Sequence, residues 1–203
     1  MKPWRELGCS ETPDGNDIRL TERDGEYVIL VNGQPLMSSR AHGSEESLAS
    51  YSCERLATVE RPRVLVGGLG MGCTLRAALD LLPPGAQIDV CEINPHVAGW
   101  CRGPLAAVNQ QALDAPRVAV QIGDVAAAIA EAARGPGAQR FHAILLDLYE
   151  GPHPGSHPQA DPFYGNRALA RTQAPLAGYG GFAGWATGGA RRIAERMRAA
   201  AVA

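Results

Sequence analysis

A strand signal that runs directly into a glycine-rich turn constrains the fold more than any other feature of this chain. The run Val64–Gly67 is apolar, and four glycines occupy six positions at its end, in the sequence GGLGMG over residues 67–72. Glycine permits positive φ and lets a ligand approach the backbone without meeting a Cβ. A helix-like segment follows. Strand, glycine turn and helix together predict the opening unit of a nucleotide-type site in a doubly wound α/β sheet.

The spacing of these glycines narrows the kind of site. A dinucleotide fingerprint has the form G-x-G-x-x-G, and counted from Gly68 its third glycine falls at Cys73. The pattern in this chain is instead G-G-x-G-x-G. The predicted contacts of this turn with a ligand are Gly67, Gly68, Leu69, Gly70 and Gly72.

Strands and helices alternate after the glycine turn, which predicts a mostly parallel sheet with helices on both faces. We expect strands at 63–67, 87–92, 117–122 and 141–147, separated by helices at 73–82, 95–107 and 124–133, and then a helix at 166–174, a strand at 181–186 and a helix at 189–201.

A small β element is expected to precede this sheet. The run Glu26–Val31 is typical of a strand, and Asn32-Gly33 after it is a hairpin signal. Ser44 is the predicted N-cap of a helix from 45 to 56. We therefore divide the chain into 1–60, with the β element and this helix, and 61–203, the ligand-binding α/β part.

Composition bounds the class of protein. The 203 residues are 45% hydrophobic and 20% charged with a net charge of −2, which is ordinary for one globular domain and indicates neither a nucleic-acid nor a membrane partner. The N-terminus is polar and lacks an apolar signal core. Five cysteines without a Cys-x-x-Cys pair are expected to be reduced, with no metal site. These features favour a cytoplasmic protein.

Acidic residues follow three of the predicted strands. Glu92 lies 20 positions beyond Gly72, the distance at which an acid can accept hydrogen bonds from ribose hydroxyls, and Ile93 follows it. Gly123-Asp124 ends the next strand, where Asp124 suits both a contact with an adenine amino group and a helix N-cap. Asp147 ends the last strand of the series, where a carboxylate can hold a cationic substrate and take a proton from an amine.

A loop rich in proline, glycine and histidine begins after Asp147 and covers 148–165. Long loops at this end of a sheet are usually functional, and we expect a lid. Glu150 and Tyr149 at its start are candidate supports of Asp147. His42 lies in a polar run before the 45–56 helix, and it is either a wall of the cleft or part of a helix cap.

These motifs resemble the spermidine-synthase-like group of class I S-adenosylmethionine-dependent transferases, over about 27–185. The resemblance rests on 64–76, 91–95, Gly123-Asp124 and 145–147. It implies that the glycine loop holds the methionine-like portion of the ligand. It further implies that Glu92 binds ribose, that Asp124 lies at adenine, and that Asp147 handles the attacking amine.

Two departures from this group bear on the reaction. Spermidine synthases carry Asp-Ser-Ser-Asp-Pro after the fourth strand, where this chain has DLYEG over 147–151. Their acidic, Tyr-containing N-terminal segment is replaced by RAHGSE over 40–45. The final antiparallel hairpin of the fold is also expected to be missing, so that the sheet is either short at that edge or completed by a partner subunit in a homodimer.

The sequence therefore predicts an S-adenosylmethionine-dependent transferase that moves an alkyl group to a small amine. Methyl transfer is the first reading, because the polyamine-recognition residues differ. Aminopropyl transfer from decarboxylated S-adenosylmethionine is the second. Lyase or cyclisation chemistry on the cofactor's aminobutyrate chain and a non-catalytic adenosyl-binding protein are the remaining alternatives.

Overall fold

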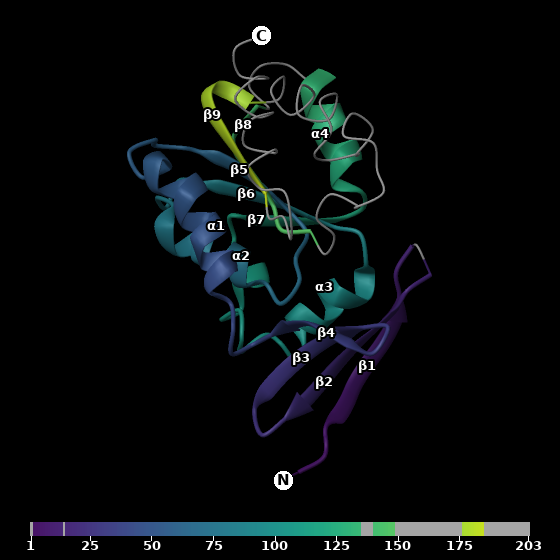
Figure 1. Ribbon diagram of the computed structural model, residues 1–203. Coiled ribbons are helices and arrows are strands. Elements are labelled where there is room, and N and C mark those ends of the chain that lie inside the picture. Colours follow the sequence, from purple (N-terminus) through teal and green to yellow (C-terminus); the bar gives the residue numbers. More distant parts are fainter. Residues whose placement is uncertain (1, 14, 135–139, 149–175, 185–203) are drawn as a thin grey trace.

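The computed structural model describes residues 2–13, 15–134, 140–148 and 176–184, which form two β-sheets and the helices around them (Figure 1). The N-terminal sheet is an antiparallel meander in the order β1-β2-β3-β4. Its turns at Asp24-Gly25 and Asn32-Gly33 have positive φ at both residues, which is the geometry of a tight hairpin. The Asn32-Gly33 hairpin is thereby confirmed. The strands are β1 (Arg5–Glu11), β2 (Asp17–Arg23), β3 (Glu26–Val31) and β4 (Gln34–Ser38).

The second sheet is parallel throughout its described strands and has the order β7-β6-β5-β8-β9. Residues of β5, β6 and β8 such as Val64, Ile88 and Ile144 are completely buried, because helices cover both faces. The predicted fold class, a doubly wound sheet preceded by a small β element, is confirmed. The strands are β5 (Arg63–Gly67), β6 (Gln87–Glu92), β7 (Val118–Ile122), β8 (Phe141–Leu146) and β9 (Leu176–Gly184).

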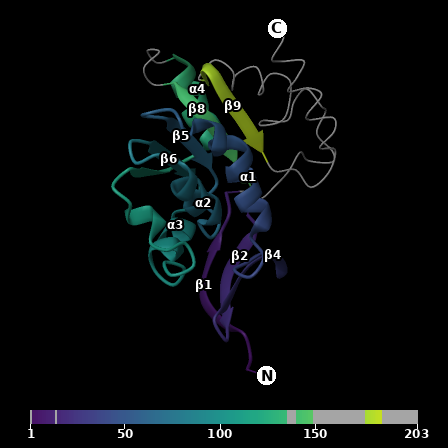
Figure 2. The same ribbon diagram turned by 90° about the vertical axis from the view of Figure 1, so that its left-hand side faces the viewer.

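Helices α1 and α2 pack together on one face of this sheet, and α4 lies on the other (Figures 1 and 2). The helix α3 lies between β6 and the N-terminal sheet. None of the helices in the described part of the chain is long and apolar enough to cross a membrane. The helices are α1 (Gly43–Cys53), α2 (Cys73–Leu81), α3 (Pro95–Arg102) and α4 (Val125–Arg134), with short 3₁₀ turns at Glu54–Leu56 and Ala112–Asp114.

Three local expectations need correction. Ser44 is not an N-cap, because its hydroxyl is bonded to the Glu45 carboxylate and α1 begins at Gly43, two residues earlier than expected, with His42 as its N-cap. The helix expected at 95–107 ends at Arg102, since Gly103 and Pro104 stop it. The strand expected at 181–186 is β9, which begins at Leu176.

Other expectations fall outside the described residues. These are the helices at 166–174 and 189–201, the side chains of Tyr149 and Glu150, nearly all of the 148–165 loop, and the chain after β9 that bears on the final hairpin.

The N-terminal sheet packs directly against the segments that follow β5 and β6. Met37 of β4 meets Gly70, where an added Cβ would lie 2.7 Å from the Met37 sulfur. On β1, the Ser10 hydroxyl lies 3.4 Å from the Asn94 Oδ1 atom, and Asn94 Nδ2 donates to the Glu11 carbonyl at 3.3 Å. The small sheet thus supports the glycine turn and the start of α3.

Candidate active site

The glycine turn and Asp147 lie at the point where the strand order of the parallel sheet reverses. The chain continues from β5 to β6 on one side, whereas β8 pairs with β5 on the other. Gly67 pairs with Leu146 across β5 and β8, so Gly68 and Asp147 follow these strands side by side. In open α/β sheets, ligands bind in the crevice at this switch point, beyond the carboxyl ends of the strands.

Gly68 lies very close to the backbone of Asp147. Its φ is +85°, and an added Cβ would lie 2.1 Å from the Asp147 carbonyl oxygen. The Gly68 N–H donates to the Cys91 carbonyl at 2.9 Å, and the Asp147 N–H donates to the Gly67 carbonyl at 2.8 Å. Only glycine fits this position, which joins the ends of three strands.

Asp147 is a partly exposed carboxylate with one described side-chain partner. The Thr74 hydroxyl, at the start of α2, donates to Asp147 Oδ2 at 2.7 Å. Burial raises the pKa of Asp147 to about 6, with smaller contributions from Glu45 and Glu92, while the Thr74 hydrogen bond lowers it. A carboxylate with a pKa near neutrality is suited to accept a proton during a reaction.

Negative charge gathers around the glycine turn. Glu45 in the first turn of α1 is only 6% exposed. Its charge, with those of Asp147 and Glu46, adds to the effect of burial that raises the pKa of Cys73 to about 12. Cys73 is therefore a neutral thiol, and the field of its surroundings favours a cationic ligand.

Glu92 is a buried carboxylate that fixes the glycine turn. Its Oε2 accepts the Leu69 N–H at 2.8 Å, and its Oε1 accepts the Asn94 N–H at 2.8 Å. Burial raises the pKa of Glu92, and these backbone hydrogen bonds lower it. A carboxylate offers about four acceptor sites, so these backbone hydrogen bonds do not use all of them. Ribose binding at Glu92 stays a prediction, and it requires that the ribose hydroxyls reach the unused acceptor sites of this buried carboxylate.

The ends of the neighbouring strands β6 and β7 expose two apolar side chains near an open glycine, Gly123. Ile93 is 50% exposed and Ile122 is 48% exposed, both unusual for isoleucine. No atom lies within 4 Å of the place where a Cβ of Gly123 would be. Asp124 is exposed and caps α4 by accepting the Ala126 N–H at 2.8 Å, as predicted, and its compatible contact with adenine stays a prediction. The pair of isoleucines offers apolar surface for a planar base.

The other residues predicted for the site make contacts within the fold. His42 stands at the N-cap of α1, and its Nδ1 lies 2.9 Å from the Glu46 carboxylate. Close packing requires a glycine at position 67, because an added Cβ would lie 2.6 Å from the Val125 side chain. The Leu69 side chain is buried in the core, and only its backbone serves the turn. Contacts of these residues with a ligand stay predictions.

Three residues of this region are not among those predicted from the sequence. Thr74 had a usable signal, because it lies two residues after the last glycine of the turn, at the start of the following helix. Ile122 also had one, as an apolar residue directly before Gly123-Asp124 at a strand end. Met37 had none, since its contact with Gly70 joins two sheets that are distant in the sequence.

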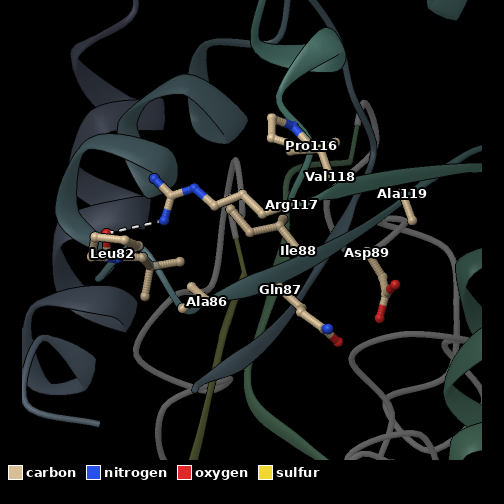
Figure 3. Close-up of a pocket in the computed structure, with 11 residues that line it drawn as sticks. Leu82, Ala86, Gln87, Ile88, Asp89, Pro116, Arg117, Val118 and Ala119 are labelled. Carbon is tan, nitrogen blue, oxygen red and sulfur yellow. Dashed lines mark hydrogen bonds between the residues drawn. The ribbon is translucent and has the colours of Figure 1, made fainter. Parts of the chain in front are cut away.

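A pocket of about 730 Å³ lies at the opposite end of the sheet, at the start of β6 and β7 (Figure 3). Two of its polar side chains, Arg117 and Asp89, make hydrogen bonds within the fold. Arg117 donates to the carbonyl oxygens of Leu79, Leu82 and Pro83 at the C-terminal end of α2, and Asp89 accepts from Arg63 at 2.8 Å. The candidate site is therefore the carboxyl end of the strands and not this pocket.

Comparison with known proteins gives structural matches only. No protein-family model matches the chain, and no curated protein matches its sequence. Solved structures match well. A spermidine synthase from Thermotoga maritima has a TM-score of 0.68 and 20% identity, over 97% of this chain and 62% of that one.

Two further structures agree with this match. A spermidine synthase in complex with the transition-state analogue AdoDATO has a TM-score of 0.63 and 18% identity, over 85% of this chain and 53% of that one. A probable spermidine synthase from Corynebacterium glutamicum ATCC 13032 has a TM-score of 0.54 and 19% identity, over 84% and 60%. The chain thus spans between half and two thirds of the length of these structures, and it has the fold of spermidine synthases.

Proposed function

We propose that this protein binds an adenosyl sulfonium compound at the carboxyl ends of β5, β6 and β8 and transfers an alkyl group from it to a small amine. The observation that carries the proposal is the position of Asp147, a carboxylate with a raised pKa, against the glycine turn at the switch point of the sheet. In the proposed arrangement the glycine turn lies against the sulfonium side chain, Glu92 against ribose, and Ile93 and Ile122 against adenine.

The residues then have defined tasks. When bound, a sulfonium compound supplies an electrophilic carbon and a thioether leaving group. Asp147 holds the neutral amine in line with the carbon–sulfur bond. As the carbon–nitrogen bond forms, the electron pair of the broken bond stays on sulfur, and Asp147 takes the proton that the new ammonium loses. Thr74 orients the carboxylate.

Aminopropyl transfer from decarboxylated S-adenosylmethionine is the form of this proposal that we favour, in place of methyl transfer as the first reading of the sequence. The likeness to spermidine synthases supports it at the level of the fold. The charge around the turn supports it independently. Glu45 and Glu92 already repel the ionised form of Asp147, and a ligand carboxylate beside them would add to this repulsion.

The choice of sulfonium compound gives a direct test. Calorimetric titration with S-adenosylmethionine and its decarboxylated form should show tighter binding of the decarboxylated one, by at least roughly 10-fold, the effect of one additional like-charge contact. Turnover with a panel of diamines and monoamines should then release methylthioadenosine. Tighter binding of S-adenosylmethionine, with release of S-adenosylhomocysteine, would instead establish the methyl-transfer reading.

The remaining alternatives leave different products in the same assay. Lyase or cyclisation chemistry on the aminobutyrate chain consumes S-adenosylmethionine in the absence of any amine. A non-catalytic adenosyl-binding protein binds tightly and turns over no member of the amine panel. Completion of the sheet by a second copy of the chain remains a proposal that sedimentation of the same sample tests.

A further inference from the structure

Asn109 is a completely buried amide in the irregular segment after α3. Its Nδ2 shares its two hydrogens among three carbonyl oxygens, those of Cys101 and Leu105, each at 3.0 Å, and, more weakly, that of Met71 at 3.4 Å. Its Oδ1 accepts the Ala112 N–H at 3.1 Å. One side chain therefore connects the end of α3 to Met71, which lies inside the glycine turn.

The same side chain also lies against the last glycine of that turn. Gly72 has a φ of +86°, and an added Cβ would lie 2.8 Å from the Asn109 Cβ. Gly72 is the N-cap of α2 and has no side chain with which to cap it. Asn109 therefore packs closely on Gly72, and its amide makes its longest hydrogen bond to the carbonyl of Met71 just before it.

Backbone strain next to Asn109 indicates that this placement is enforced by its surroundings. Gln110 and Gln111 have φ of +52° and +54°, the left-handed region that residues with a Cβ rarely adopt. Such residues persist only where the surrounding structure determines them, and they gather at functional sites. Here the Gln111 N–H is held by the Ala106 carbonyl at 2.8 Å. The two strained residues turn the chain so that Asn109 enters the interior.

We infer that Asn109 is a positioning residue of the adenosyl site: it holds the turn Gly68–Gly72 in the conformation that receives the ligand, through Met71 and Gly72. This inference rests on the proposed function for the identity of the ligand. It does not require that Asn109 touch the ligand, because a side chain with 0% exposure acts here only through the turn.

The test compares Asn109→Ala with Arg117→Met. Arg117 also donates to three carbonyl oxygens, but at the other end of α2. Both variants lose stability, whereas only Asn109→Ala should change the turn. We expect faster amide hydrogen exchange over residues 68–75 of the ligand-free protein and a Kd for methylthioadenosine raised at least about 10-fold. Arg117→Met should leave both near the wild-type values.

Each substitution is also made together with Gln111→Gly, which removes one left-handed non-glycine residue and offsets part of the lost stability. Equal exchange over 68–75 and equal Kd values in the Asn109→Ala and Arg117→Met proteins would overturn the inference. If the wild type binds no adenosyl compound, the proposed function fails. The exchange comparison in the ligand-free proteins still decides whether Asn109 holds the turn.

Discussion

Replacing Gly68 with alanine is expected to lower the affinity for adenosyl compounds at least roughly 100-fold. The alanine would have to adopt a φ of +85°, and its Cβ would lie 2.1 Å from the Asp147 carbonyl oxygen. The left-handed backbone costs about 1–2 kcal/mol and overpacking about 1–3 kcal/mol more, so the turn or the end of β8 has to move. Either movement displaces groups that the ligand needs. Calorimetric titration with methylthioadenosine measures the loss.

Gly33→Ala is the matched control for this change. Gly33 has a φ of +76° in the β3–β4 hairpin, and no atom lies within 4 Å of its added Cβ. This variant carries the backbone strain without the contact, and it lies outside the proposed site. Its affinity should equal that of the wild type. Similar affinities for the Gly68→Ala and Gly33→Ala proteins would show that the ligand does not use the turn.

Asp147→Asn is expected to lower turnover by roughly 10²–10⁴ while methylthioadenosine binding stays within a few-fold of wild type. The amide keeps the shape of the side chain and can still accept from Thr74, but it cannot take a proton. The acidic limb of the wild-type kcat/KM profile, which reports the ligand-free protein, should lie near pH 6, the pKa of Asp147. Full turnover in the Asp147→Asn protein would make Asp147 a structural residue.

Two measurements separate this loss from damage to the fold. The folded-state pKa of Asp147, about 6, lies above its ordinary value of 3.8, so the wild type loses stability as the pH rises between these values. The Asp147→Asn protein escapes this loss and should be the more stable one at pH 7.5, by denaturant unfolding.

Thr74→Val keeps the base but removes its hydrogen bond, which should shift the acidic limb to higher pH.

The sequence was most informative where local chemistry determines the structure. The glycine pattern at 67–72 requires backbone that bends and packs closely, and the structure has positive φ at Gly68, Gly70 and Gly72. The alternation of apolar runs with helix signals located β5, β6 and β8 to within a residue. The Asn32-Gly33 hairpin was equally readable, because its turn type demands those residues.

The parts that sequence reasoning missed depend on contacts between distant segments. Nothing local indicates that Met37 packs on Gly70, or that Asn109 reaches the Met71 carbonyl. Glu92 was predicted as a ribose ligand, yet its hydrogen bonds to the Leu69 and Asn94 N–H groups could not be read from spacing. These contacts arise from the packing of the whole fold, which local patterns do not encode.

Titration of the wild type and of Glu92→Ala with methylthioadenosine measures whether an adenosyl compound binds at the glycine turn and Glu92. We expect saturable one-to-one binding by the wild type. Binding by the variant should be weaker by about 1–3 kcal/mol, the scale for losing hydrogen bonds to a charged group. Circular dichroism confirms that both proteins are folded. No saturable binding by the folded wild type, or equal affinity of the two proteins, would contradict the claim.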